Sequence, residues 1–287
     1  MSTYKKPLKA KMVHVERAVI YALLIILIVI CIVPFVMMIV NATRSAAQIN
    51  NGFTLIPSTH FIENLNSIKE KANVDLWNGL KNSAIIAFSA TALTAYFSTL
   101  TAFGFEFYEF KGKNFLFAAI LLMMMVPAQL GMLGFYTVSV KLRMLNTFYP
   151  LIFPSIANIF GVFFIRQYMA SVIHRSLIEA ARIDGASEIT IFHKIIFPLT
   201  VPATATITIM GFIGIWNNYL GPLMILQTND KKTIPLMIGA LKGARVAQNN
   251  FGALYAAIAV SIIPIIVIFV VFSKFIISGI SAGGVKE

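Results

Sequence analysis

The stretch Glu179–Leu199, EAARIDGASEITIFHKIIFPL, separates two strongly apolar parts of the chain. It holds three acidic residues, two basic residues, a histidine and a glycine. The rest of the chain is very different, because 58% of all 287 residues are hydrophobic and only 12% are charged. A soluble domain of this size could not cover that much apolar surface. The polar stretch therefore indicates an ordered loop of a membrane protein.

Six uncharged or nearly uncharged runs fill most of the chain. Each is close to or above the roughly 20 residues that an α-helix needs to cross the hydrocarbon core. Strand-like alternation is absent, so helices rather than a barrel satisfy the backbone in lipid. We expect an all-α integral membrane protein with six transmembrane helices, the fourth of which extends past Arg166. The runs are Ala18–Val40, Asn82–Phe105, Phe115–Tyr136, Phe148–Ile165, Phe197–Gln227 and Phe251–Ser273.

Basic residues in the loops set the expected orientation. Five of them directly precede the first run, whereas four basic residues in the last outer loop argue the other way. Because Lys and Arg are enriched on the cytoplasmic side, we expect both termini in the cytoplasm. The basic residues of the leader are Lys5, Lys6, Lys9, Lys11 and Arg17.

Several classes of function are disfavoured by what the sequence lacks. The net charge of +12 is scattered among loops, so nucleic-acid binding is not expected. The nucleotide-binding pattern GxxxxGK[ST] is absent, and no nucleophile, base and orienting residue form a catalytic set. Cys31 is the only cysteine and the four histidines are dispersed. We therefore expect no catalytic residue, no metal site and no cofactor in this chain.

The apolar runs contain neutral polar residues in place of acidic ones. None of the runs holds an Asp or Glu at membrane depth, which argues against proton-coupled transport. Amide groups beside an aromatic ring suit a hydroxyl-rich, uncharged ligand such as a sugar. Alternatively, these amides only form hydrogen bonds between helices. The candidate pathway residues are Gln129, Asn158 and, within one turn of the fifth run, Asn217, Asn218 and Tyr219.

The polar stretch divides into two short predicted helices. Ser176 and Glu179 have capping-box spacing, so we expect the first helix to begin there. Gly185 can end it in the left-handed conformation, and Ser187 can cap the second. Pro198 marks the start of the fifth membrane helix. The mixed charge fits a protein partner better than anionic lipid headgroups. The apolar side chains available for contact are Ile178, Ala181, Ile189, Phe192 and Ile195.

These residues resemble a known family. Glu179-Ala180-Ala181, then Asp184-Gly185-Ala186 and finally Pro198, resemble the EAA loop of ATP-binding-cassette importer permeases. The resemblance covers nearly the whole chain, more closely after residue 75 than before it. The acidic residue that usually follows Trp-Asn in the family is replaced by Asn218. Three further segments resemble maltose-type carbohydrate permeases of the shorter, six-helix kind, namely Trp216–Leu220, Thr233–Leu236 and Ser278–Lys286.

The resemblance implies a transporter subunit rather than an enzyme. Such permeases pair with a second, homologous permease chain and with two copies of a nucleotide-binding ATPase, which binds ATP and Mg²⁺. An extracytoplasmic binding protein delivers the sugar, and transport proceeds by alternating access in the bacterial cytoplasmic membrane. The tail 278–287 would reach between the ATPases, and Leu241–Asn250 would probe the binding protein. The implied ATPase-coupling residues are Glu179, Ala180, Ala181, Asp184, Gly185 and Pro198.

We expect two parts of the chain. Residues 1–75 would hold the cytoplasmic leader, the first transmembrane helix and the first outer loop. Residues 76–287 would form the permease core, with a coupling loop at 174–197 and a cytoplasmic tail at 278–287. The alternative function is a self-sufficient facilitator or channel for a small polar solute, with the polar stretch serving only as a membrane-surface element. A polytopic membrane enzyme would need a catalytic set that the sequence lacks.

Overall fold

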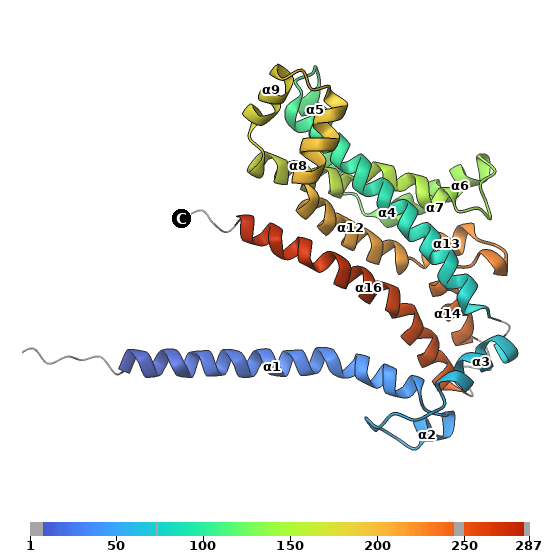
Figure 1. Cartoon of the computed structure of the whole chain (residues 1–287). Helices are drawn as coiled ribbons and strands as arrows, with labels where there is room; N and C mark the ends of the chain where they lie inside the picture. Colours follow the sequence, from blue (N-terminus) through green and yellow to red (C-terminus); the bar gives the residue numbers. More distant parts are fainter. Residues whose placement is uncertain (1–7, 73, 244–249, 284–287) are drawn as a thin grey trace, which may run out of the picture. The chain divides into compact units, whose positions relative to one another are not determined.

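The computed structural model describes residues 8–72, 74–243 and 250–283, and every regular element within them is a helix (Figure 1). The helices belong to two compact units. One consists of residues 1–74 and 241–260, and the other of residues 75–240 and 261–287. All the candidate pathway and coupling residues of the sequence analysis fall in the second unit.

The first unit contains α1 (Leu8–Ala42), α2 (Ala46–Asn50), α3 (Phe61–Ala72) and the beginning of α16 (Phe251–Gly283). Large apolar side chains are exposed along much of α1, as expected of a helix in lipid. After α1, the buried Arg44 donates a 3.0 Å hydrogen bond from Nη1 to Asn41 Oδ1. The amide of Asn64 donates to the carbonyls of Ala42 and Arg44, at 2.9 and 3.0 Å. Buried polar contacts therefore fix the chain where α1 ends.

The second unit is built around α4 (Leu76–Phe107), whose buried face is rich in Ala, Ser and Thr. Small side chains let helices approach closely in lipid. The Thr94 hydroxyl donates to the carbonyl of Ser155 at 3.0 Å, and Ser98 lies directly against Gly161. The remaining elements that begin in this unit are α5 (Lys113–Met124), η1 (Ala128–Gly131), α6 (Met132–Lys141), α7 (Tyr149–Ile152), η2 (Phe153–Ala157), α8 (Ile159–Val172), α9 (Arg175–Ile183), α10 (Glu188–Ile191), η3 (Phe192–Ile196), α11 (Phe197–Leu199), α12 (Val201–Trp216), α13 (Leu220–Ile225), η4 (Asn229–Lys231) and α14 (Ile234–Gly243).

Among the described residues, four stretches of helix are long and apolar enough to cross a membrane, namely 17–42, 76–107, 149–172 and 251–275. Two bent pairs supply two further spans if each pair counts as one, namely 113–124 with 129–141 and 188–199 with 201–216. The prediction of an all-α protein with six membrane spans is confirmed in this form. The fourth span also extends past Arg166, to Val172, as expected. The third and fifth runs, however, are interrupted rather than straight.

Prolines account for both interruptions. Pro127 lies between α5 and the 3₁₀ helix η1. In the fifth run, the helical stretch 188–199 meets α12 at Thr200 with a bend of 74°, between Pro198 and Pro202. A proline has no N–H for the backbone bond of a continuous helix, so it kinks or ends one. The π-helical turn η3 immediately before α11 adds a further local irregularity.

The fifth run also ends earlier than its composition predicts. Helix α12 stops at Trp216, and α13 begins at Leu220. The expectation that Asn217, Asn218 and Tyr219 share one turn of a membrane helix is therefore wrong. Asn218 Oδ1 accepts a hydrogen bond from the N–H of Gly221 at 3.2 Å. Asparagine side chains that bond nearby backbone favour turns and caps over helix interiors, which explains the break.

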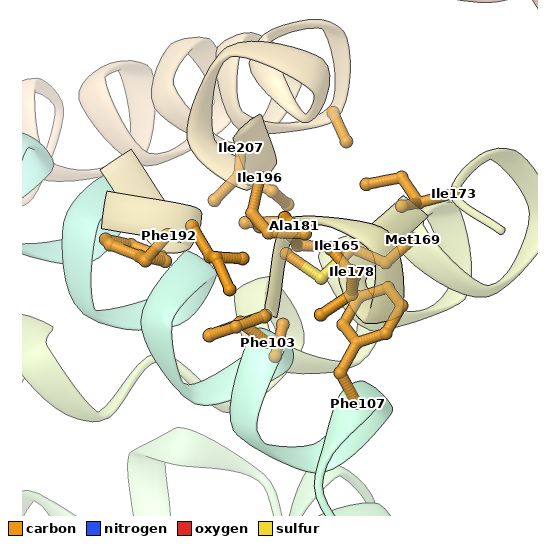
Figure 2. Close-up of a cluster of buried hydrophobic side chains, with 13 residues drawn as sticks. Phe103, Phe107, Ile165, Met169, Ile173, Ile178, Ala181, Phe192, Ile196 and Ile207 are labelled. Atoms are coloured by element: carbon orange, nitrogen blue, oxygen red, sulfur yellow. The ribbon is translucent and has the colours of Figure 1, made fainter. Parts of the chain in front are cut away.

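A cluster of 13 buried apolar side chains, here called the loop cluster, joins α4 to the polar stretch (Figure 2). Full burial of one large apolar side chain contributes roughly 1.5–3 kcal/mol. The loop cluster is therefore the main force that fixes the polar stretch to the membrane helices. Its members are Ala102, Phe103, Phe107, Ile165, Met169, Ile173, Ile178, Ala181, Ile191, Phe192, Ile196, Ala203 and Ile207.

Candidate functional site

The first helix of the polar stretch begins one residue before the predicted capping box. Helix α9 starts at Arg175, and His174 occupies the cap without a side-chain capping hydrogen bond to any described residue. Ser176 is thus already inside the helix, so the predicted pairing of Ser176 with Glu179 as a capping box is wrong. Only the cap residues Ile173 and His174 connect α8 to α9, and Ile173 is buried. This short connection fixes where α9 begins.

The turn at Gly185 has the predicted left-handed conformation, with φ of +80°. The N–H of Gly185 donates to the carbonyl of Arg182 and that of Ala186 to the carbonyl of Ala181, both at 3.0 Å. This pair of bonds is the Schellman motif that closes a helix. Ser187 then caps α10, because its hydroxyl accepts a hydrogen bond from the N–H of Thr190 at 3.3 Å. Both local predictions are confirmed.

The polar stretch presents one buried and one exposed face. Ile178, Ala181 and Phe192 belong to the loop cluster, and Figure 2 shows them among side chains of the membrane helices. They are therefore not free for a partner, and that part of the prediction is wrong. Ile195 packs partly against the same cluster. The exposed face includes Glu179, Ala180, Ile183, Asp184, Ile189 and, on α11, Pro198.

Arg175, the first residue of α9, contacts the end of α4. Its Nη2 donates to the backbone carbonyl of Glu106 at 3.0 Å, and its Nη1 lies 3.4 Å from Glu109 Oε1. Lys113 Nζ lies 3.0 Å from the same carboxylate oxygen. The hydrogen bond from Lys113 lowers the pKa of the Glu109 carboxyl, and Arg175 adds to this effect. One exposed acidic group therefore accepts from two basic side chains.

Tyr108 contacts the polar stretch on the other side of the Gly185 turn. Its hydroxyl donates to Glu188, whose Oε1 also accepts from Arg182 Nε at 2.7 Å. The Arg182 guanidinium carbon lies 5.4 Å from the centre of the Tyr108 ring. Burial raises the pKa of the Tyr108 phenol, and the hydrogen bond to Glu188 raises it further, so the hydroxyl keeps its proton and donates.

Two of the five candidate pathway residues meet at one cavity. Gln129 of η1 and Asn218, between α12 and α13, both line a cavity of about 530 Å³. The lining comes from η1, α6, α7, η2, α13 and the break before α13, and we call this cavity the break cavity. Its remaining lining residues are Gly131, Met132, Phe135, Pro150, Leu151, Pro154, Leu220 and Gly221.

The other three candidates make other contacts instead. Asn158 caps α8, because its Oδ1 accepts from the N–H of Gly161 at 2.6 Å. The amide of Asn217 donates to the carbonyl of Ile213 at 2.9 Å. The ring of Tyr219 lies against Gly239, where an added Cβ would come within 2.8 Å of it. The break cavity thus contains only part of the predicted set.

An ion pair of Glu106 and Arg166 did not emerge from the sequence analysis. Arg166 Nε lies 3.2 Å from Glu106 Oε2, with side chains only 23% and 13% exposed, although these two atoms make no hydrogen bond. The guanidinium also lies 4.0 Å over the ring of Phe117, at cation–π distance. The sequence held a signal for this pair: Arg166 is a lone charge in the fourth apolar span, and Glu106 directly follows the second apolar run.

Some predictions concern residues outside the described ranges. In the segment Leu241–Asn250, residues 244–249 lie outside them, and so do residues 284–287 of the tail and residues 1–7 of the leader. Within the described part of the chain, no three His, Cys, Asp or Glu side chains are grouped as they would be around a metal ion.

Comparison with known proteins finds relatives over nearly the full length. The chain is 35% identical over 260 residues to the arabinooligosaccharides transport system permease protein AraQ of Halalkalibacterium halodurans, covering 90% of this chain and 92% of that protein. It is 31% identical to the lactose transport system permease protein LacG of Rhizobium radiobacter, covering 93% and 95%. It is 30% identical to the sn-glycerol-3-phosphate transport system permease protein UgpE of Escherichia coli, covering 91% and 94%.

The fold is also that of a known transporter chain. A bacterial ABC transporter involved in the import of the acidic polysaccharide alginate contains a chain that superposes with a TM-score of 0.76, at 24% identity. The match covers 96% of this chain and 99% of that one. Residues 95–281 match the profile of the family described as "Binding-protein-dependent transport system inner membrane component". The chain is therefore an integral membrane permease that belongs to this family of binding-protein-dependent transport systems.

Proposed function

We propose that this chain is one of two permease chains that together form the sugar path of an ATP-driven importer. Membership of the binding-protein-dependent transport family supports this role. The names of two relatives support a carbohydrate as the substrate, because they refer to arabinooligosaccharides and lactose. An oligosaccharide is the substrate class that we propose.

The break cavity is the observation that carries this proposal. Gln129 and Asn218 supply amide groups beside the ring of Phe135, which suits a ligand with many hydroxyls and apolar C–H faces. Charged side chains are missing from the described residues that line it. Irregular backbone at membrane depth is tolerated where it lines a cavity, and broken helices form binding sites in many transporters. The cavity therefore favours an uncharged, hydroxyl-rich substrate.

The exposed face of the coupling loop is the proposed contact with the ATPase. It combines the carboxylates of Glu179 and Asp184 with Ile183, whose side chain is 86% exposed. An exposed apolar side chain with charges around it is typical of a protein contact surface. The ATPase would be present in two copies and would bind ATP and Mg²⁺, since this chain lacks the nucleotide-binding pattern.

The proposed location is the bacterial cytoplasmic membrane with both termini in the cytoplasm. The basic leader before α1 supports this orientation. It puts the coupling loop on the side where ATP is available and the segment after η4 on the side of an extracytoplasmic sugar-binding protein. Closure of the ATPases on ATP would then move the coupling loop and open the path outward, which is alternating access by near-rigid bodies.

ATP hydrolysis by the assembled complex tests this function. The complex would be purified with both permease chains and the ATPase, and hydrolysis measured after addition of the binding protein with single sugars, neutral and acidic. We expect a neutral oligosaccharide on the binding protein to stimulate hydrolysis. A chain that purifies without any ATPase, or a complex that no loaded binding protein stimulates, would contradict the proposal.

A further inference from the structure

The end of α4 is linked to the coupling loop on both sides of the Gly185 turn. On one side, Arg175 at the start of α9 donates to the carbonyl of Glu106 and to the carboxylate of Glu109. On the other side, the Tyr108 hydroxyl donates to Glu188 of α10. The two residues that directly follow α4, Tyr108 and Glu109, therefore contact both helices of the loop.

The link through Tyr108 also closes the hairpin itself. Glu188 accepts from Arg182 Nε at 2.7 Å and from Arg182 Nη2 at 3.3 Å, so it joins α9 to α10 as well as to Tyr108. The ring of Tyr108 packs edge-on against Phe103 of the loop cluster, with centroids 5.4 Å apart. Tyr108 thus has its ring on the apolar cluster and its hydroxyl on the polar network.

These polar links are poorly suited to stabilising the fold. The side chains of Arg182 and Glu188 are 38% and 45% exposed, and ion pairs at that exposure contribute little to stability. The loop cluster already supplies the apolar burial that holds the loop. The links instead restrict orientation: the bidentate Arg182–Glu188 pair fixes α9 against α10, and the hydrogen bond from Tyr108 restricts how this hairpin can rotate on α4.

Helix α4 leads from these links to the break cavity. It runs for 32 residues without a proline. Midway, Thr94 donates to the carbonyl of Ser155, next to Pro154 of the cavity lining. Near its start, the amide of Asn82 donates to the carbonyl of Asp230 at 2.8 Å. A displacement of its last turn therefore reaches η2 and the segment after α13 through direct hydrogen bonds.

We propose that Tyr108 is a positioning residue of the transport cycle, which ties Glu188 to α4 so that movement of the coupling loop is transmitted to the break cavity. The inference rests on the proposed function. It names the residue that connects the coupling loop to α4 and the helix through which movement reaches the break cavity. Without the phenol hydroxyl, the loop remains attached through its apolar face, but its rotation displaces α4 only in part. ATP is then hydrolysed in cycles that move no sugar.

The test is the number of ATP molecules hydrolysed per sugar imported by the complete complex in proteoliposomes. Tyr108→Phe keeps the ring on Phe103 and removes only the hydroxyl. The matched control is Tyr168→Phe, which makes the same change on a tyrosine of α8 that packs against the loop cluster. We expect the ratio to rise about fivefold in Tyr108→Phe, as for loss of one hydrogen bond of ordinary net strength, and to stay unchanged in the control.

A second pair of variants tests whether Tyr108 acts through Glu188. Glu188→Gln should raise the same ratio, and the double variant should be no worse than the worse single variant, because both changes break one link. An unchanged ratio in Tyr108→Phe, or effects that multiply in the double variant, would overturn the inference. So would loss of complex assembly in both single variants, which indicates a purely structural role. If the wild-type complex imports no sugar with ATP, the proposed function fails instead.

Discussion

Asn217 and Asn218 are adjacent in the chain, yet their side chains have different surroundings. Asn218 lines the break cavity, whereas the amide of Asn217 donates to the carbonyl of Ile213 in α12. Asn218 also makes a local backbone contact of its own, because its Oδ1 accepts a hydrogen bond from the N–H of Gly221. Each asparagine thus has one hydrogen bond to nearby backbone. The two asparagines therefore form a matched pair for substitution, because only Asn218 lines the break cavity.

Replacing Asn218 with Leu should reduce sugar uptake more than replacing Asn217 with Leu. Both changes remove one local hydrogen bond, but only the change at Asn218 removes an amide from the cavity lining. Loss of one sugar hydrogen bond corresponds to about five- to tenfold in uptake efficiency. The measurement is initial uptake rate against sugar concentration, with complex yield as the assembly control. Equal effects of the two variants would mean that Asn218 does not contact the substrate.

Gly185→Val should uncouple transport while leaving the membrane helices intact. The space around Gly185 is open, so strain arises from its φ of +80° alone. A β-branched residue in that region costs about 1–3 kcal/mol, which a shift of α9 against α10 would relieve. We expect lower recovery of the ATPase with the permease and loss of ATP-driven uptake.

The control for this change is Gly185→Asn, because asparagine tolerates the left-handed region much better than valine. It should retain most of the uptake of the wild type. If Asn is as damaging as Val, the cause is contact of the added side chain with a partner rather than backbone strain, and the argument from φ is wrong.

Arg166→Met should destabilise the protein because it leaves the carboxylate of Glu106 poorly solvated and unpaired. Removing one partner of a fully buried pair costs about 3–5 kcal/mol, and we expect about 2 kcal/mol here because both side chains are slightly exposed. Adding Glu106→Gln should restore most of the loss. The measurement is the thermal unfolding midpoint in detergent. A double variant no more stable than Arg166→Met would show that the pair is not what stabilises this site.

Gly161→Ala should weaken the packing of α8 on α4. The new Cβ would come within 2.7 Å of Ser98 Oγ and 3.0 Å of Asn158 Oδ1, and overpacking of this kind costs about 1–3 kcal/mol. Gly104→Ala in α4 is the control, since an added Cβ there meets no described atom within 4 Å. The control should be neutral or slightly stabilising. Similar unfolding midpoints for the two variants would contradict the packing argument.

Single cysteines should report the proposed orientation. In a Cys31→Ser background, cysteines at Lys111 and Lys194 should react with an impermeant maleimide only from the cytoplasm. Cysteines at Lys69 and Lys242 should react only from outside; all four native side chains are exposed. Labelling of Lys194→Cys from outside would place the coupling loop away from ATP and refute the contact proposed for it.

Local signals in the sequence predicted local structure well. Gly185 and Ser187 act within four residues of themselves, and both took the predicted roles. Hydrophobic length predicted where the membrane spans lie. The capping box at Ser176 failed because the buried end of α8 and the contacts of Arg175 fix the start of α9, and these depend on residues far away in the chain.

Contacts between distant segments could not be predicted from the sequence alone. Apolar composition does not distinguish a straight span from one broken at Pro127 or after Trp216, because both halves are equally hydrophobic. The meeting of Gln129 with Asn218 depends on those breaks. Ile178 and Phe192 looked like free contact residues because their burial partners, such as Met169, come from other helices.

Sugar uptake into proteoliposomes is the measurement that tests the central claim most directly. The complete complex would be reconstituted with ATP enclosed on the ATPase side and the sugar-loaded binding protein on the other. We expect accumulation of sugar above its external concentration with ATP and none without it. Equilibration of sugar that is independent of ATP and of the ATPase would contradict the importer and identify a facilitator.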